Sequence, residues 1–299
     1  TLNSEVVFKL LEDAKNMGIK SITWTGGGEP TVHKDFFEFI KLASKFNIKQ
    51  GLNTNGALLN DEMIDFIARN FSYVRFSVDA GTKETLSQCH RTSENDFERI
   101  CKNIKLMTEA KKKYNSNIVI GYSFLIDKTN FRDIVKSTQL AKNLGVDYIQ
   151  IKPIVNYTES NEQFSKESEI WRELNLKFEE IKTLETDNFK VRILNHKFDN
   201  IKLQDENYGR KYHKCVGCNV LASVGANGFV DLCCAYKGID KWSLGNINEE
   251  RFEEIWKGNK RKEVKEKIVI NKCPPMCKAD EINRMVDFIK KFDANKEFI

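Results

Sequence analysis

The sequence predicts an α/β protein, a partial (β/α)6, TIM-like barrel followed by a small cysteine-rich α+β domain. Two observations carry this prediction: short β-type runs alternate regularly with amphipathic helical stretches before about residue 200, and six of the eight cysteines follow that point. Strands separated by helices of this length are joined by right-handed crossovers and form a parallel sheet. We therefore expect a barrel domain over 1–200 and a second domain over 201–299.

The predicted elements begin with a helix from Ser4, a candidate N-cap residue, to about Met17, because apolar residues recur there at helical spacing. The strands that follow are predicted at 21–25, 48–53, 73–79, 118–126 and 147–152, and the helices at 35–46, 61–69, 97–113, 131–144 and 167–184. After about residue 200 this alternation gives way to cysteines, glycines and short elements, which indicates a second domain.

Composition narrows the class of protein. With 299 residues, 40% of them hydrophobic and 30% charged, the chain can bury a substantial core. The net charge of +5 is spread along helical faces, so charge does not indicate nucleic-acid binding. Neither an apolar run of 18 residues nor the layout of a signal peptide occurs, so we expect a cytoplasmic protein without a membrane partner.

Polar and glycine-rich segments follow three successive predicted strands. Gly26–Pro30 follows the first, Thr54–Gly56 the second, and Ser77 and Asp79 end the third. Ligands of parallel β/α folds bind at the carboxyl ends of strands, and residues without side chains let a ligand approach the backbone. A flexible turn, an Asn-Gly turn and a helix cap by Asp79 are the structural alternatives.

Taken in order, Thr-Gly-Gly-Gly-Glu-Pro, Thr-Asn-Gly and Ser-Val-Asp-Ala-Gly resemble the radical S-adenosylmethionine (radical SAM) superfamily, over nearly the whole chain. The resemblance implies that the Gly-Gly-Glu segment binds the methionine amino group, and that the third strand end lies near the ribose and methionine carboxylate. Ser123 and Lys152, on later strands, are weaker matches. In the alternative interpretation each is a solvated or core polar residue. The candidate cofactor-binding residues are Gly27, Gly28, Glu29, Pro30, Thr54, Asn55, Ser77, Asp79, Ser123 and Lys152.

One family motif is absent from the sequence. Members carry Cys-x3-Cys-x2-Cys after their first strand, and no such triplet occurs here. The helix from Ser4 resembles the helix that follows that loop, so the first strand and the ligands of a catalytic [4Fe–4S] cluster are expected upstream of Thr1. The alternative is a degenerate member that cannot cleave S-adenosylmethionine. The retained cofactor-binding residues favour the first interpretation.

The cysteines after residue 200 indicate a metal site. In a cytosolic protein they stay reduced, and thiolates from three segments suit zinc or an iron–sulfur cluster, between which spacing alone does not choose. The pattern resembles the auxiliary-cluster domains called SPASM and twitch, through Gly228 and Cys233 and a helix with Phe252, and the few cysteines favour twitch. We assign one auxiliary [4Fe–4S] cluster to Cys215, Cys233, Cys273 and Cys277, with Cys218 and Cys234 as substitutes. A structural zinc site is the alternative.

Two cysteines lie outside this group. Cys89, after the third strand end, is a candidate hydrogen-atom donor to a substrate radical, and a half-buried helix cysteine is the alternative. Cys101 is predicted to lie in the core.

The resemblance implies an enzyme that reductively cleaves S-adenosylmethionine to a 5′-deoxyadenosyl radical, which abstracts hydrogen from a small-molecule or peptide substrate. Electrons would come from a donor such as flavodoxin or ferredoxin. Dehydrogenation is the expected reaction, and epimerisation, crosslinking and nucleoside modification fit the same sequence. A zinc-stabilised, non-catalytic binding module is the alternative of another class.

Overall fold

The structure is a computed structural model of the chain, and it describes residues 1–154, 169–202, 210–273 and 277–291. The chain divides into two compact units. One comprises Gly18–Lys202, and the other combines Thr1–Met17 with Leu203–Ile299. The first 17 residues are thus grouped with the C-terminal part of the chain. The predicted division into domains 1–200 and 201–299 stays a prediction.

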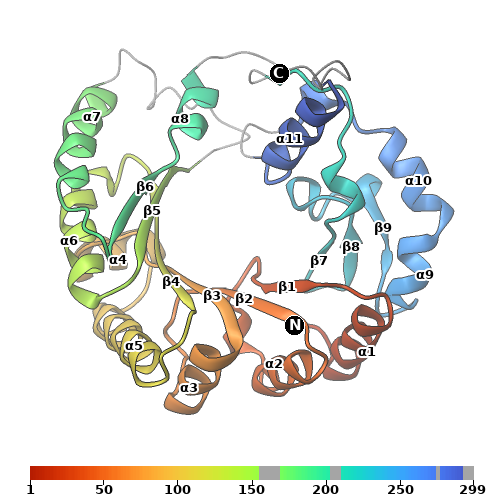
Figure 1. The fold of residues 1–299 in the computed structure, drawn as a ribbon, viewed down its shortest axis with the longest axis horizontal. Coiled ribbons are helices and arrows are strands. Elements are labelled where there is room, and N and C mark those ends of the chain that lie inside the picture. Colours follow the sequence, from red (N-terminus) through yellow and green to blue (C-terminus); the bar gives the residue numbers. More distant parts are fainter. Residues whose placement is uncertain (155–168, 203–209, 274–276, 292–299) are drawn as a thin grey trace, which may run out of the picture. The chain divides into compact units, whose positions relative to one another are not determined.

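The larger unit is built on a six-stranded parallel sheet (Figure 1), which confirms the predicted fold class. The strands lie in the order of the chain, so every crossover places the next strand on the same side of the last. The sheet is curved like part of a barrel (Figure 1). Its strands are β1 (Ser21–Trp24), β2 (Lys49–Thr54), β3 (Phe71–Ser77), β4 (Val119–Ile126), β5 (Tyr148–Pro153) and β6 (Lys190–Ile193).

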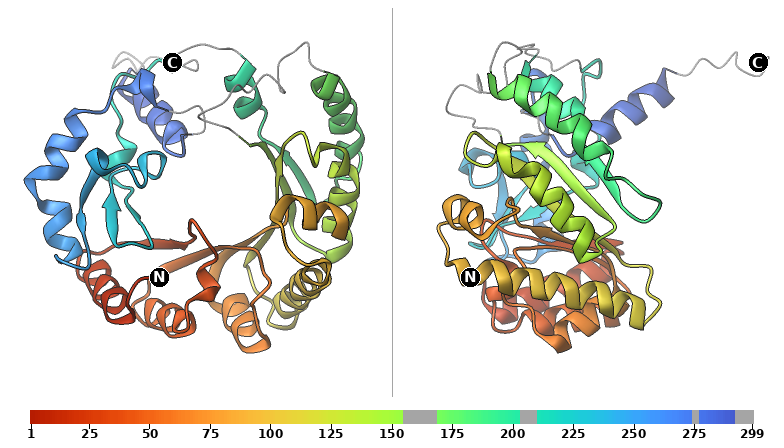
Figure 2. Two further views of the ribbon diagram at one scale, coloured as in Figure 1. Left: turned by 180° about the vertical axis from the view of Figure 1, so that it is seen from behind. Right: turned by 90° about the vertical axis from the view of Figure 1, so that its left-hand side faces the viewer.

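Helices cover one face of this sheet (Figures 1 and 2). The apolar core lies between that face and the helices, and includes Phe76, Tyr122 and Phe124, each fully buried. The covering helices are α2 (Phe36–Lys45), α3 (Asp61–Asn70), α4 (Lys83–His90), α5 (Glu94–Lys113), α6 (Ile134–Leu144), α7 (Glu169–Lys182) and α8 (Asn195–Lys202).

The opposite, inner face of the sheet is polar. Side chains alternate between the two faces of a strand, so residues next to core positions lie on the inner face. The inner-face residues of the five strands from β2 to β6 are Lys49, Gly51, Asn53, Tyr73, Arg75, Ser77, Val119, Gly121, Ser123, Leu125, Tyr148, Gln150, Lys152, Lys190 and Arg192.

The smaller unit contains an antiparallel sheet of β7 (Ser223–Val224), β8 (Phe229–Asp231) and β9 (Ser243–Asn246). Its helices are α1 (Ser4–Asn16), α9 (Phe252–Lys257), α10 (Asn259–Glu266) and α11 (Asp280–Lys290). As expected, the helix with Phe252 follows the hairpin. Gly228 has φ +88°, and a Cβ there would lie 2.1 Å from the Asn248 side chain, so the hairpin needs glycine at this position.

Two details differ from the sequence prediction. The N-cap of α1 is Asn3, whose side chain accepts a hydrogen bond from the Glu5 N–H at 2.9 Å, and Ser4 is the first helical residue. Both residue types suit an N-cap, and only the extended backbone of Asn3 decides between them. The short elements β6 and α4 were not predicted, because four to eight residues carry little periodic signal. Among the described helices, none has the length and apolar character needed to cross a membrane.

Candidate cofactor and cluster sites

The Glu29 carboxylate joins the carboxyl ends of β1 and β2. One of its oxygens accepts hydrogen bonds from the backbone N–H and hydroxyl of Thr31 and from the Thr54 hydroxyl, at 3.0, 2.6 and 2.7 Å. The other accepts one from the Asn55 N–H at 2.7 Å. A carboxylate oxygen can accept a second hydrogen bond, so Glu29 is held rigidly and still has acceptor capacity for an amino group.

The segments beside Glu29 leave room for a ligand. A Cβ added to Gly28 would meet nothing within 4 Å, so open space borders the backbone there. Pro30 begins a short 3-10 turn that fixes the exit from the glycine segment. Gly56 has φ +77°, and a Cβ there would lie 2.7 Å from the Phe76 ring, so this position requires glycine.

Two hydroxyl groups meet across the inner face. Ser77 and Ser123 are register partners on β3 and β4, and Gln150 is the partner of Ser123 on β5. None of these three side chains has a hydrogen-bond partner within the part of the chain that the structure describes. They suit recognition of ribose hydroxyls or a carboxylate, as the family resemblance implies for Ser77.

The Asp79 side chain does not continue the alternation of β3. Its φ of +59° takes it out of the strand, and the backbone N–H groups of Val78 and Asp79 both donate to the Ser123 carbonyl at 3.3 Å. Its carboxylate accepts a hydrogen bond from the Leu125 N–H at 2.7 Å and lies 3.3 Å from the His90 ring. The hydrogen bond with Asp79 raises the pKa of His90, which favours an ion pair. These contacts are structural, and the cofactor role of Asp79 stays a prediction.

Two further predicted residues lie at this end of the sheet. Lys152 is half-buried near the end of β5, where its register partner is Leu125. Cys89 lies in α4, with its sulfur 3.6 Å from the Thr129 hydroxyl in the loop after β4. Burial raises the pKa of Cys89, so the group is a neutral thiol at neutral pH. A neutral thiol is the form that carries a transferable hydrogen atom.

In the smaller unit, α11 supports the first cysteine pair. The buried Asn283 side chain accepts hydrogen bonds from the backbone N–H groups of Val216 and Gly217 at 2.8 and 2.9 Å. Its amide nitrogen lies 3.6 Å from the Cys215 sulfur. Hydrogen bonding from Cys218 and Asn283 lowers the pKa of Cys215 to about 6, which favours the thiolate that binds metal. Cys218 is buried, and its thiol donates to the Cys215 carbonyl.

The four assigned cysteines share one neighbourhood. The Tyr236 hydroxyl lies 3.7 Å from the Cys273 sulfur, and Tyr236 also interacts electrostatically with Cys233 and Cys277. Cys277 interacts in the same way with Cys273 and Cys215. Cys234, in contrast, is exposed. The assignment of Cys215, Cys233, Cys273 and Cys277 to one cluster stays a prediction.

No three candidate ligands among the described residues lie close enough to hold a single ion.

A buried arginine, Arg210, positions the last cysteines. Its guanidinium donates to the backbone carbonyl of Cys273 at 2.8 Å and lies 3.4 Å from the Asp280 carboxylate. The Tyr212 hydroxyl donates to the same carboxylate at 2.6 Å. Arg210 and Asn283 were not predicted, because no local motif surrounds them and each meets its partners more than 60 positions away.

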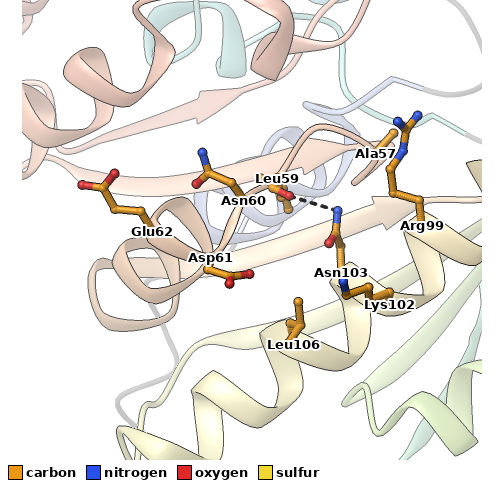
Figure 3. Close-up of a pocket in the computed structure, with 9 residues that line it drawn as sticks. All are labelled: Ala57, Leu59, Asn60, Asp61, Glu62, Arg99, Lys102, Asn103 and Leu106. Atoms are coloured by element: carbon orange, nitrogen blue, oxygen red, sulfur yellow. Dashed lines mark hydrogen bonds between the residues drawn. The ribbon is translucent and has the colours of Figure 1, made fainter.

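The cleft shown in Figure 3 is separate from these sites. It has a volume of about 500 Å³ and lies between α3 and α5, where the Asn103 side chain donates to the carbonyls of Gly56 and Leu59. None of the predicted cofactor-binding residues lines it. It is a groove between two covering helices, and we assign no ligand to it.

Comparison with known families identifies the class. A family model described as the radical SAM superfamily matches residues 1–141, and one for SPASM, described as an iron–sulfur cluster-binding domain, matches residues 215–279. The chain thus carries a radical SAM domain and a SPASM domain. The second match includes all six cysteines that follow residue 200. The two domains imply S-adenosylmethionine and [4Fe–4S] clusters as cofactors.

Relatives are similar over different parts of the chain. A tungsten-containing aldehyde ferredoxin oxidoreductase cofactor-modifying protein of Pyrococcus furiosus is 29% identical over 161 residues, which cover 52% of this chain and 44% of that protein. An AdoMet-dependent heme synthase of Methanosarcina barkeri is 24% identical, with 85% of this chain and 73% of that protein covered. The chain spans less than half the length of the first relative.

A solved structure shows the same fold. Streptococcus suis SuiB bound to S-adenosylmethionine superimposes with a TM-score of 0.62 at 16% identity, covering 86% of this chain and 59% of SuiB. The likeness extends over most of the chain and supports the fold alone.

Proposed function

We propose that the protein reductively cleaves S-adenosylmethionine and uses the resulting radical to abstract hydrogen from a small-molecule or peptide substrate. The observation that carries this proposal is Glu29, which is fixed between two strand ends beside the open space at Gly28. When bound, a catalytic [4Fe–4S] cluster and S-adenosylmethionine supply one-electron cleavage to a 5′-deoxyadenosyl radical.

We assign the binding and orientation of S-adenosylmethionine to residues at the strand ends of this chain. Glu29 accepts the methionine amino group, since one of its carboxylate oxygens has spare acceptor capacity. Ser77 and Ser123 provide hydroxyls on the inner face, and Lys152 adds a positive charge on the same face. Asp79 acts through His90 and the Leu125 N–H by holding the end of β3 in place.

The auxiliary cluster belongs to the SPASM domain, with Cys215, Cys233, Cys273 and Cys277 as its ligands. Dehydrogenation is the reaction we favour, because an auxiliary cluster can accept an electron from the oxidised substrate. In the epimerisation alternative, the Cys89 thiol donates a hydrogen atom to the substrate radical and becomes a thiyl radical that a reductant must then restore. The iron–sulfur description of the matched domain favours these proposals over a zinc-stabilised binding module.

We also place the protein in the cytoplasm, with a flavodoxin or ferredoxin as electron donor, because reduced thiols and a low-potential reductant are available there. The decisive experiment is anaerobic reconstitution of the native full-length protein with iron and sulfide, followed by an assay for 5′-deoxyadenosine with dithionite. We expect production of 5′-deoxyadenosine that depends on S-adenosylmethionine. A protein loaded with clusters that forms none would contradict the proposal.

A further inference from the structure

The inner face of the sheet contains cationic side chains and no acidic ones. Arg75, Lys152 and Arg192 lie on it, whereas none of the inner-face residues from β2 to β6 is Asp or Glu. Burial of a guanidinium without a counter-charge is unfavourable, which applies to the half-buried Arg75, whereas Arg192 is exposed. Both guanidinium groups pair best with oxyanions. An inner face of this composition is suited to an anionic ligand.

Two tyrosines lie across glycines on this face. A Cβ at Gly51 would lie 2.1 Å from the Tyr73 ring, and a Cβ at Gly121 would lie 2.3 Å from the Tyr148 ring. Any side chain at either glycine would displace the tyrosine beside it. The two glycines therefore allow both rings to lie flat against a neighbouring strand.

The two rings hold Arg75 between them. Arg75 is half-buried, its guanidinium carbon lies 5.7 Å from the Tyr73 ring and 6.0 Å from the Tyr148 ring, and its Nε donates to the Tyr148 hydroxyl at 3.0 Å. Stacking and hydrogen bonding together limit the rotamers of the side chain. Arginine has five N–H donors, and the others on Arg75 have no acceptor among the described residues.

Arg192 contacts the same ring. Its guanidinium carbon lies 4.3 Å from the centre of the Tyr148 ring, so the two arginines share one neighbourhood. Within the described ranges neither arginine forms an ion pair. Asn53, the register partner of Arg75 on β2, has a buried side-chain oxygen without a hydrogen-bond partner there. The site thus combines two cations with one unsatisfied acceptor.

We propose that Arg75 and Arg192, arranged by Tyr148, bind the carboxylate or phosphate oxyanion of the substrate, and that Asn53 accepts a hydrogen bond from an adjacent N–H or O–H group of that substrate. This assignment of an anionic substrate rests on the proposed function. The strand register places Arg75 two residues before Ser77, so the oxyanion site adjoins the proposed S-adenosylmethionine site along β3.

The test is site-resolved labelling of the native protein with phenylglyoxal, which modifies accessible guanidinium groups. Labelling of each arginine is quantified by peptide mass spectrometry with citrate, with pyrophosphate or with neither. We expect one of the anions to slow modification of both Arg75 and Arg192 by about tenfold, because a bidentate pair shields the guanidinium. Protection by citrate alone identifies a carboxylate substrate, and protection by pyrophosphate alone identifies a phosphorylated one.

Arg69 is the matched control, since it stacks on Tyr114 at 5.1 Å but belongs to the covering helix α3. Its labelling should not change. The substitution Tyr148→Phe removes only the hydroxyl that binds Arg75, and it should weaken protection of Arg75 while the ring still stacks on Arg192. Unchanged labelling of Arg75 and Arg192 with both anions, or equal protection of Arg69, would overturn the proposal.

The labelling is independent of catalysis. It is performed without S-adenosylmethionine, so a failure to form 5′-deoxyadenosine would leave its result intact. Conversely, formation of 5′-deoxyadenosine by a protein whose Arg75 and Arg192 are not protected by either anion would contradict the oxyanion site alone and leave the proposed cleavage of S-adenosylmethionine intact.

Discussion

The carboxylate of Asp13, in α1, accepts hydrogen bonds from the Arg251 guanidinium and from the Phe252 N–H, 238 and 239 positions later in the chain. Asp13 is 3% exposed, so these partners take the place of water as its hydrogen-bond donors. The Phe252 N–H is one of the donors that the start of a helix leaves without an intrahelical acceptor, and Asp13 satisfies it. The contact joins α1 to α9 within the smaller unit.

Replacement of Asp13 by Ala should therefore destabilise the smaller unit by about 1–3 kcal/mol, because the Phe252 N–H and Arg251 lose their acceptor. Urea denaturation followed by circular dichroism measures this change. Glu12→Ala is the matched control, since Glu12 is exposed and lies 3.7 Å from the same guanidinium. Equal effects of the two substitutions would show that the Asp13 contact is not formed.

Glu29→Gln should weaken binding of S-adenosylmethionine and lower stability. Both carboxylate oxygens face backbone N–H donors, so the amide nitrogen of Gln meets a donor in either orientation. One lost hydrogen bond and one unsatisfied donor correspond to about 1–3 kcal/mol. Calorimetric titration with S-adenosylmethionine and urea denaturation test the two effects. Glu38→Gln, on the exposed side of α2, should change neither.

The His90 and Asp79 pair predicts a pH dependence. Because Asp79 raises the pKa of His90 above its usual value of about 6.5, the pair stabilises the fold fully below that pH. The contribution is lost as pH rises through the raised pKa. The difference in unfolding free energy between the native protein and His90→Gln should thus shrink from pH 6 to pH 8, and a constant difference would contradict the pairing.

An NMR titration of His90 provides the direct measurement. Asp79→Asn should return the pKa of His90 toward its ordinary value, while the Asn side-chain oxygen still accepts from the Leu125 N–H. This variant separates the ion pair from the backbone contact, since only the first depends on charge.

Cysteine substitutions should separate ligands from neighbours. Alanine at Cys233 or Cys273 should strongly lower the iron content of the reconstituted 299-residue chain, because the auxiliary cluster loses one of its four assigned thiolates. Cys234→Ala should retain iron, since that side chain is exposed, and so should Cys101→Ala in α5. Iron and sulfide analysis with visible absorbance measures the outcome. Retention of zinc in place of iron would restore the structural-zinc alternative.

Substitution of Cys218 tests which cysteine of the pair Cys215 and Cys218 is the cluster ligand. Hydrogen bonding by the Cys218 thiol is the largest of the contributions, ahead of the Asn283 side chain, that lower the pKa of Cys215 to about 6. Cys218→Ala should therefore retain iron and bind it less readily at low pH. Loss of all iron in this variant, with iron retained in Cys215→Ala, would exchange the two assignments.

Much of this architecture follows from local patterns in the sequence. Alternating strand and helix periods predicted the order of the larger unit, because each period reflects which side of an element is buried. The glycine and acidic residues at the strand ends, and the cysteine groups, predicted the two sites through their chemistry. Gly228 illustrates the limit of such patterns. The sequence motif includes this glycine, but only the structure shows that its backbone has a positive φ.

Tertiary structure decided the contacts between residues that are distant in sequence. Strand register alone brings Arg75 and Arg192 to one tyrosine, and the packing of α11 brings Asn283 to Cys215. The placement of α1 beside α9 through Asp13 and Arg251 is of the same kind. The physical reason is that periodicity records whether a side chain is buried, whereas its partner depends on how separate elements pack.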